Sequence, residues 1–351
     1  MISISAVIPT YNGIAYLTEA LRSALAQTYE LLEIIVVDDG SQEDIEKIVS
    51  PFYPKVRYVR QQNAGPAAAR NRGVSLAQGE VIAFLDDDDV WHPTKTAEQV
   101  KVLEAYPDCA LVYSLPELID ETGRKTSPYQ LPSEHPSGSV YLDFVKRNRI
   151  STPSVTLIRR EVFEKAGYFD ENREYFCGED YDLWLRIARH YEIRFCPGIL
   201  VSYRVRTSGI SHNTDNALKG DLYTLDKLIS RHRRHPKVSD REFYPAFDCN
   251  LYHTFRRFAY WYYFSYENRD MARKLMLAAF NRSAYYTDPK DRAAQRNPAV
   301  AFALRRPYYF KDVLYLMVFF MPGAAFQLLR NAKRRLAALL SGVGGRSADN
   351  A

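Results

Sequence analysis

The feature that most constrains the fold is a regular alternation of short apolar runs and helical stretches over residues 1–113. The apolar runs, which contain many β-branched residues, are Ser3–Ile8, Leu32–Val37, Val56–Val59, Val81–Leu85 and Ala110–Tyr113. The stretches with helical character between them are Ile14–Gln27, Glu43–Val49, Pro66–Ala77 and Pro93–Ala105. Strands that alternate with helices at this spacing form βαβ units. The sequence therefore predicts an α/β fold with a mostly parallel central sheet flanked by helices.

After residue 113 the pattern becomes less regular and then helical. Residues 115–150 contain many Pro, Ser and Gly residues, and we interpret them as a variable loop region. The regular elements expected after this region are Ser154–Ile158, a helix from about Asp180 to His190, and two short strands at Ile193–Phe195 and Ile199–Tyr203. From Asn213 onward the chain is helical in pattern and unusually aromatic, and its last residues are rich in Gly and Ser. We expect a folded domain over 1–212, a helical region over 213–340 and a disordered tail over 341–351.

The net charge of +5 hides two halves of opposite sign. Residues 1–200 carry 21 Lys and Arg against 30 Asp and Glu, which gives −9, whereas residues 201–351 carry 26 against 12, which gives +14. An acidic half suits the binding of a cation, and a basic half suits an anionic partner. Because no nucleic-acid-binding module is recognisable, we expect an anionic membrane surface and no nucleic acid.

The C-terminal half contains one candidate for membrane contact. The 17 residues Val313–Leu329 carry no charge, but Pro322 and Gly323 interrupt them, and a bilayer span needs about 20 apolar residues. Lys333, Arg334 and Arg335 follow, so the segment suggests a peripheral amphipathic anchor more than a span. The alternative is that the aromatic residues form a helical core or a homodimer interface.

The cysteines and the N-terminus indicate the compartment. Cys109, Cys177, Cys196 and Cys249 form no C-x-x-C motif, and their density does not suggest a disulfide framework. The first residues have no basic region and too short an apolar run for a signal peptide. We therefore expect a cytoplasmic protein, located peripherally on the inner face of the cell membrane.

Polar residues follow four of the predicted strands in succession. They are Pro9-Thr10-Tyr11-Asn12, Asp38-Asp39-Gly40-Ser41, Gln61-Gln62-Asn63-Ala64-Gly65 and Asp86-Asp87-Asp88-Asp89. A parallel sheet binds ligands beyond the carboxyl ends of its strands, so these loops are predicted to share one ligand-binding edge.

The run Asp86–Asp89 is the strongest candidate for cation binding. Four adjacent carboxylates at a buried strand end repel one another unless a cation or hydrogen-bond donors compensate them. A hard divalent cation prefers such oxygen ligands and is completed by phosphate groups of a ligand. The alternative is a loop in which one Asp caps the helix near Pro93.

Two further segments suggest the binding of a nucleotide-like ligand. Asp38 and Asp39 can accept hydrogen bonds from a ring N–H or from sugar hydroxyls, although Ser41 could instead cap the next helix. Asn63 and Gly65 open a helix whose N-terminus favours an anion, and Arg70 adds a positive charge. No P-loop and no G-x-G-x-x-G fingerprint is present, which argues against a P-loop NTPase and a dinucleotide oxidoreductase.

A candidate general base lies in Gly178-Glu179-Asp180-Tyr181-Asp182. Acidic residues at a helix N-terminus are favoured by the helix dipole, which is the purely structural explanation. Asp180 lies three residues before Leu183 on the expected buried face, and a partly buried carboxylate near a cleft is suited to proton abstraction.

Five motifs in order resemble glycosyltransferase family 2, the inverting nucleotide-sugar transferases with the GT-A fold, which is a Rossmann-like fold of nucleotide-diphospho-sugar transferases. They are Val7-Ile8-Pro9-Thr10-Tyr11-Asn12, Val37-Asp38-Asp39-Gly40-Ser41, Asn63-x-Gly65-x-x-x-Ala69-Arg70-Asn71, Phe84-Leu85-Asp86-Asp87-Asp88-Asp89 and Gly178-Glu179-Asp180-Tyr181-Asp182-Leu183-Trp184. The resemblance covers residues 1 to about 212, and Ala166-Gly167-Tyr168-Phe169-Asp170-Glu171 is similar to the family segment before the base.

The resemblance implies roles for individual residues. Residues expected to bind the nucleotide-sugar are Pro9, Thr10, Tyr11, Asn12, Asp38, Asp39, Asn63, Gly65, Arg70, Asp86 and Asp87. Asp180 would be the catalytic base, with Glu179 beside it. Asp86 and Asp88 form the D-x-D pair that would hold Mn²⁺ or Mg²⁺, and His212 is a further candidate ligand. Because Asp87 and Asp89 are also carboxylates, the sequence leaves open which of them contacts the metal.

The expected activity is the inverting transfer of a sugar from a nucleotide-diphospho-sugar, a UDP-sugar being favoured, to an acceptor hydroxyl. The acceptor would be a saccharide or a lipid-linked saccharide in the synthesis of a cell-envelope polysaccharide such as lipopolysaccharide, or of a glycolipid, and residues 115–150 would line its site. The alternatives are a sugar nucleotidyltransferase and a non-catalytic nucleotide-sugar-binding partner. The segment after the first strand lacks the Gly-rich, basic loop of the former, and the intact carboxylates argue against the latter.

Overall fold

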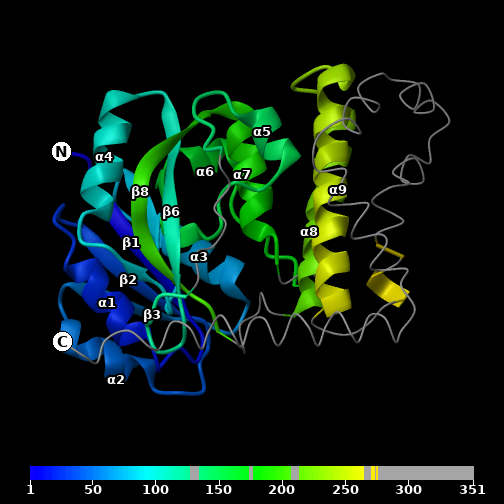
Figure 1. Cartoon of the computed structure of the whole chain (residues 1–351). Helices are drawn as coiled ribbons and strands as arrows, with labels where there is room; N and C mark the ends of the chain where they lie inside the picture. The colour runs from blue at the N-terminus through cyan, green and yellow to red at the C-terminus, as the bar shows by residue number, and fades with distance from the viewer. Residues whose placement is uncertain (127–133, 174–176, 207–212, 265–269, 273, 276–351) are drawn as a thin grey trace, which may run out of the picture. The chain divides into compact units, whose positions relative to one another are not determined.

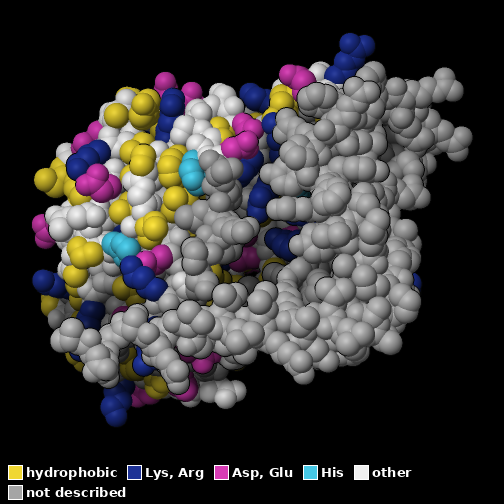
Figure 2. All heavy atoms as spheres, viewed as in Figure 1, with side chains coloured by type: hydrophobic (Ala, Val, Ile, Leu, Met, Phe, Trp, Pro, Cys, Tyr) yellow, Lys and Arg dark blue, Asp and Glu magenta, His cyan; other side chains and the backbone are white. Residues whose placement is uncertain are grey.

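The computed structural model describes residues 1–126, 134–173, 177–206, 213–264, 270–272 and 274–275. The chain divides into two compact units, Met1–Asn250 and Leu251–Ala351, and the sheet with its surrounding helices belongs to the first. On the face drawn in Figure 2, acidic and basic side chains are interspersed over the surface of the first unit.

The first unit is built on an eight-stranded mixed sheet with the order β3-β2-β1-β4-β7-β6-β8-β5 (Figure 1). The strands are β1 (Ile4–Thr10), β2 (Glu33–Asp38), β3 (Val56–Arg60), β4 (Val81–Phe84), β5 (Val90–Trp91), β6 (Cys109–Ile119), β7 (Thr156–Arg159) and β8 (Glu192–Arg204). Strand β1 pairs in parallel with β2 and β4, β2 with β3, and β6 with β8. Strand β7 is antiparallel to both of its neighbours, and β5 is antiparallel to β8. The prediction of an α/β fold with a mostly parallel sheet is therefore confirmed.

The first strands form because their residues can be buried on both faces. All seven residues of β1 and all four of β4 are buried, and both strands lie in the middle of the sheet. A strand covered on both sides needs a continuous apolar run in place of an alternating one, and this is the pattern that made these strands visible in the sequence.

Helices cover the sheet and carry the site residues. They are α1 (Leu17–Leu25), α2 (Ile45–Val49), α3 (Pro66–Leu76), α4 (Lys95–Ala105), α5 (Tyr141–Lys146), α6 (Val162–Ala166), α7 (Glu179–His190), α8 (Thr214–Arg234) and α9 (Asp240–Phe264), with 3₁₀ turns η1 (Ser50–Phe52) and η2 (Pro153–Val155). Helix α3 packs on β1 and β2, and α7 contacts α5, α6 and α8. A Cβ added at Gly73 would lie 2.2 Å from Cγ1 of Val7, so this glycine lets α3 approach β1 closely.

The structure corrects three local predictions. The two short strands expected at 193–195 and 199–203 are one strand, β8, because register shifts against β6 and the positive φ of Gly198 accommodate the intervening residues. The region 115–150 is more regular than expected, since β6 continues to Ile119 and α5 begins at Tyr141. Asp44, and not Ser41, caps α2 by accepting from the backbone N–H of Lys47.

The chain after residue 213 is helical wherever the structure describes it at length, as the sequence predicts. Helix α8 and the first part of α9 belong to the first unit, which extends to Asn250. Residues 313–329, 333–335 and 341–351 lie outside the described residues. Within the described part, no helix is long and apolar enough to cross a membrane. All four cysteines have free thiols.

Candidate active site

The carboxyl ends of β1, β2 and β4 meet at one edge of the sheet, as their parallel pairing requires. The backbone N–H of Asp39 donates to the carbonyl of Thr10 at 2.9 Å. The Thr10 hydroxyl in turn donates to Oδ2 of Asp87 at 2.5 Å. Loops from three strands are thus joined by hydrogen bonds, and the polar groups expected at one edge of the sheet lie together there.

The four aspartates after β4 form a tight turn. The backbone N–H of Asp89 donates to the carbonyl of Asp86 at 3.1 Å and closes the turn. Asp86 accepts from Arg70 at 2.7 Å and from the hydroxyl of Thr152 at 3.1 Å. The same hydroxyl lies 3.4 Å from Oδ2 of Asp89, so Thr152 connects the first and last carboxylates of the run.

The last two aspartates face the end of β8. Oδ2 of Asp88 pairs with Nε of Arg206 at 2.7 Å. Asp89 is fully buried, and its Oδ1 accepts from the backbone N–H of Arg204 at 3.0 Å. Within the run, Asp86, Asp87 and Asp88 remain partly exposed. No Asp of the run caps α4, whose N-cap is Thr94.

The crowded carboxylates have raised pKa values. Burial and the neighbouring charge of Asp88 raise the pKa of Asp87 to about 7, against the opposing hydrogen bond from Thr10. Burial also raises the pKa of Asp88, although Arg206 opposes this effect. The pKa of Asp89 is raised well above its usual range by burial and by Asp86. The turn thus concentrates negative charge in a region of low solvent access.

Arg70 on α3 connects the acidic turn to the candidate base. Its guanidinium donates to Asp86 at 2.7 Å and to Glu179 at 2.9 Å, and its side chain is buried. Burial would lower the pKa of Arg70, but Asp86 and Glu179 outweigh this effect and raise it. Within the described part of the chain, the buried Nε of Arg70 has no hydrogen-bond partner, so its N–H group is an unused donor.

The candidate base lies in the first turn of α7. Gly178 precedes the helix in a left-handed conformation, and Glu179 and Asp180 are its first two residues. Oδ1 of Asp180 accepts from the backbone N–H of Tyr181 at 2.6 Å. Burial and the charge of Glu179 raise the pKa of Asp180 to about 7, and Arg70 opposes the shift. A carboxylate with this pKa is suited to accept a proton near neutral pH.

The adjacent Asp38 and Asp39 have different environments. Asp38 is fully buried and accepts from the backbone N–H of Ser41 at 2.8 Å and from the hydroxyl of Tyr58 at 2.7 Å. Asp39 accepts from the backbone N–H groups of Ala64 and Gly65 at 2.9 and 2.8 Å. Asp38 thus stabilises the turn that follows β2, and Asp39 stabilises the loop that precedes α3.

The remaining predicted ligand residues lie around this edge at different depths. Pro9 is buried inside β1, whereas Tyr11 is 50% exposed. Asn12 has a positive φ of 54°, and its side-chain oxygen accepts from the backbone N–H of Gln42. Asn63 accepts from Arg173 at 2.8 Å through its side-chain oxygen. His212, the third candidate metal ligand, lies outside the described residues.

Four residues outside the sequence motifs shape the acidic turn. Ser154 accepts from the backbone N–H of Asp86 at 3.0 Å, and Thr152 donates to the Asp86 carboxylate. Arg204 donates to the carbonyl of Asp88 at 2.8 Å and pairs with Glu19 at 2.6 Å, and Arg206 pairs with Asp88. In the sequence, the only indication of a role for Arg204 and Arg206 is their alternate spacing at the end of a β-strand.

Comparisons with known proteins agree with this fold and point to one family. The sequence model of the Glycosyl transferase family 2 matches residues 5–167. An uncharacterised glycosyltransferase of Rickettsia prowazekii is 34% identical over 248 residues, which are 68% of this chain and 77% of that protein. An uncharacterised glycosyltransferase of Bacillus subtilis, YwdF, is 32% identical over 65% of this chain and 84% of that protein.

Two solved structures share the fold at low sequence identity. The mannosyltransferase PcManGT from Pyrobaculum calidifontis, in complex with GDP-Man and Mn²⁺, has a TM-score of 0.57 and 19% identity, covering 89% of this chain and 83% of that chain. S. aureus TarS 1–349 in complex with UDP-GlcNAc has a TM-score of 0.55 and 18% identity, covering 82% and 93%.

The fold and the similar sequences therefore identify a glycosyltransferase with the GT-A architecture. The chain belongs to glycosyltransferase family 2. The family resemblance of the five sequence motifs is thereby confirmed, and glycosyl transfer is the activity that the family carries.

Proposed function

We propose that the protein transfers a sugar, with inversion, from a nucleotide-diphospho-sugar to a hydroxyl group of an acceptor. The observation that carries this proposal is the bridge from Asp86 through Arg70 to Glu179. It places the acidic turn, on which a sugar diphosphate would be held, beside the half-buried Asp180. The elements needed for donor activation and for proton removal thus meet at one edge of the sheet.

The donor side would bind through the ends of β1, β2 and the loop that opens α3. Tyr11 has an exposed ring. Asp39 holds the loop Asn63–Gly65 in place through two hydrogen bonds from its backbone N–H groups. The left-over N–H of Arg70 provides a positive donor toward a diphosphate. The solved relatives named above carry UDP-GlcNAc and GDP-Man, so both uracil and guanine nucleotides are candidates, and a UDP-sugar remains our favoured donor.

The acidic turn fits a divalent cation by the chemistry of its donors. Asp86 and Asp88 present partly exposed hard oxygen ligands, and the Asp88 carboxylate already pairs with the cationic Arg206. Among the described residues, no three His, Cys, Asp or Glu side chains converge as a ready-made metal site, so the substrate phosphates would supply further ligands. Mn²⁺ or Mg²⁺ held by Asp86 and Asp88 would stabilise the negative charge of the diphosphate leaving group.

The acceptor would be activated by Asp180. Its carboxylate takes the proton of the acceptor hydroxyl as that oxygen attacks the anomeric carbon. The new glycosidic bond forms on the face opposite the breaking bond to the diphosphate, so a single displacement inverts the configuration. Glu179 pairs with Arg70, and its charge helps to raise the pKa of the neighbouring Asp180 to about 7.

A thermal-shift panel tests the donor half of the proposal. Melting temperatures are compared for UDP, GDP, CDP and dTDP, each with and without Mn²⁺. A stabilisation by one nucleotide that requires Mn²⁺ supports both the donor class and the cation. A panel in which none of the four nucleotides raises the melting temperature contradicts nucleotide-sugar binding.

The acceptor class and location follow from the charge distribution of the sequence. The excess of 26 Lys and Arg over 12 Asp and Glu in residues 201–351 favours association with an anionic membrane surface. A lipid-linked saccharide would be presented at such a surface. We therefore extend the proposal to synthesis of an envelope polysaccharide or glycolipid at the inner face of the cell membrane.

A further inference from the structure

Helix α8 makes backbone-level contact with the residues that precede the candidate base. A Cβ added at Gly220 would lie 2.1 Å from the carbonyl oxygen of Cys177. A Cβ added at Gly178 would lie 2.8 Å from the Thr224 hydroxyl and 3.0 Å from the carbonyl oxygen of Gly220. The two glycines therefore allow an approach between α8 and the start of α7 that no larger residue would permit.

A hydrogen bond from α8 engages the first turn of α7. The carbonyl of Gly178 accepts from the backbone N–H of Asp182 at 2.9 Å, which is the bond that begins the helix. The same carbonyl accepts from the hydroxyl of Thr224 at 3.2 Å. Thr224 thus binds directly to the peptide group that precedes Glu179.

A buried ion-pair network continues the contact along α8. Asp182 is only 2% exposed and pairs with Lys227 at 3.1 Å and with Arg231 at 2.9 Å, both on α8. Burial would raise the pKa of Asp182, but Arg186, Arg231 and Lys227 outweigh this effect and lower it. Lys227 also pairs with Asp170 at 2.5 Å.

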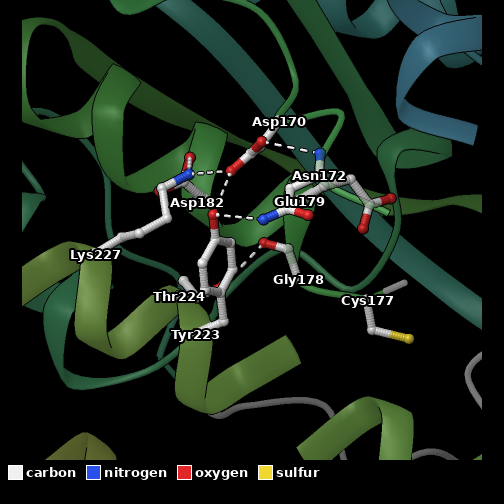
Figure 3. Close-up of a pocket in the computed structure, with 9 residues that line it drawn as sticks. All are labelled: Asp170, Asn172, Cys177, Gly178, Glu179, Asp182, Tyr223, Thr224 and Lys227. Atoms are coloured by element: carbon white, nitrogen blue, oxygen red, sulfur yellow. Dashed lines mark hydrogen bonds and ion pairs between the residues drawn. The ribbon is translucent and has the colours of Figure 1, made fainter. Parts of the chain in front are cut away.

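Figure 3 shows how these side chains lie relative to one another. Lys227 lies between Asp170 and Asp182, and Thr224 faces Gly178. The cavity that they line with Glu179 has a volume of about 10 Å³, which holds one water molecule at most. Within the part of the chain that the structure describes, α8 therefore packs closely against Cys177 and Gly178, the two residues before Glu179.

We propose that α8 is a positioning element for the reaction, in which Thr224 and Lys227 fix the start of α7 so that Glu179 and Asp180 face Arg70 and the acidic turn. This proposal rests on the role proposed above for Asp180. Neither α8 residue contacts the candidate base itself, so both act through the backbone of α7. Displacement of a reacting group by about 1 Å can lower a rate about a hundredfold, so such a support has a measurable effect on turnover.

The test compares Thr224→Val and Lys227→Met with the matched control Lys219→Met, which changes an exposed lysine on the same helix. Hydrolysis of the nucleotide-sugar selected by the thermal-shift panel is measured at a temperature at which every variant is folded by circular dichroism. We expect kcat to fall about tenfold or more in both variants while KM for the donor stays within about twofold. Lys227→Arg should restore most of kcat, and Lys219→Met should leave it unchanged.

Alkylation of Cys177 provides a readout that does not depend on the chemistry. Burial and the carboxylates of Glu179 and Asp180 raise the pKa of the Cys177 thiol to about 12, so iodoacetamide should modify it slowly in the wild-type protein. Loosening of the segment should accelerate this modification several-fold in Thr224→Val and Lys227→Met. Mass spectrometry distinguishes Cys177 from the buried Cys109 and Cys196.

Together, kcat and the rate of Cys177 alkylation distinguish a failure of the positioning proposal from a failure of the proposed base. Wild-type kcat together with wild-type Cys177 alkylation in Thr224→Val and Lys227→Met would overturn the positioning role. Should Asp180→Asn retain normal turnover, the proposed base is wrong, whereas faster Cys177 alkylation would still support fixation of α7 by α8. Thr224→Val, which preserves shape, keeps the test decisive if Lys227→Met does not fold.

Discussion

Nη1 of Arg70 donates to Oε1 of Glu179 at 2.9 Å, although 109 residues separate them in the sequence. The same guanidinium donates to Asp86, so one side chain sets the spacing between the acidic turn and the first turn of α7. An arginine can do this because its planar group presents several donors in fixed directions. The contact joins the donor side and the acceptor side of the proposed site.

Replacement of Arg70 should therefore damage both stability and activity. Arg70→Met leaves two partly buried carboxylates without their cation, and breaking a buried ion pair in this way costs about 3 kcal/mol. Urea denaturation measures this loss, and donor hydrolysis should fall at the same time. Arg72→Met, an exposed neighbour on α3, is the matched control and should change neither quantity. If Arg70→Met and Arg72→Met had the same stability and the same rate of donor hydrolysis, the ion pairs of Arg70 would contribute nothing to either quantity.

Turnover should depend on the ionisation of Asp180. Its pKa is raised from 3.8 to about 7, and a base must be deprotonated, so kcat should increase with pH through about 7 and then level off. Burial is the main cause of this raised pKa, the charges of Glu179 and Asp86 add to it, and Arg70 opposes it. Asp180→Asn should lower kcat by about 10²–10⁴-fold at pH 8 while nucleotide binding is retained. Near-normal turnover of this variant, with an unchanged pH profile, would exclude Asp180 as the base.

The cation requirement should depend on Asp88. Asp88→Ala removes a proposed oxygen ligand, so the Mn²⁺ concentration for half-maximal donor hydrolysis should rise at least about tenfold, equivalent to about 1.4 kcal/mol. Titration of Mn²⁺ into the assay measures this directly. Asp108 is an exposed carboxylate outside the acidic turn, so Asp108→Asn serves as the control for loss of charge. If the Asp88 variant titrates like wild type, the ligand role belongs to another carboxylate.

Gly13 should not tolerate a side chain. A Cβ at this position would lie 1.9 Å from Oδ2 of Asp87 and 2.5 Å from the hydroxyl of Thr10, so these hydrogen-bonded groups must move to accommodate it. Gly13→Ala is expected to destabilise the fold by about 1–3 kcal/mol and to weaken nucleotide binding about tenfold. Calorimetric titration with the nucleotide chosen by the thermal-shift panel gives the affinity. Unaltered binding would place the nucleotide away from this contact.

Membrane association should depend on the basic residues near the C-terminus. Replacement of Lys333, Arg334 and Arg335 by Ser removes three positive charges, each of which contributes about 1 kcal/mol next to an anionic surface. Flotation with vesicles of phosphatidylglycerol and phosphatidylcholine should show binding of the wild-type chain that weakens about a hundredfold in the variant. Undiminished flotation of the triple variant would contradict the proposed anchor, and vesicles of phosphatidylcholine alone are the control for charge.

The strands β1, β2 and β4 could be predicted because burial on both faces requires apolar runs, which are visible without any knowledge of the fold. The same holds for the polar residues that follow them, including Thr10, Asp39 and Asp86. The continuous course of β8 could not be predicted, because Pro197 and Gly198 interrupt its pattern. Its continuity depends on register shifts against β6, which is a strand more than 70 residues earlier in the sequence.

The amino-acid sequence specifies which chemical groups are available, namely a run of four aspartates, a second acidic pair and an arginine on an Ala-rich helix. The partners of these groups depend on the tertiary packing. It assigns Asp89 and Asp38 to internal hydrogen bonds, pairs Asp88 with Arg206, and joins Asp86 to Glu179 through Arg70. The physical reason is that hydrogen bonds and ion pairs act over a few ångströms, and only the packing of the helices on the sheet brings residues distant in sequence within that range.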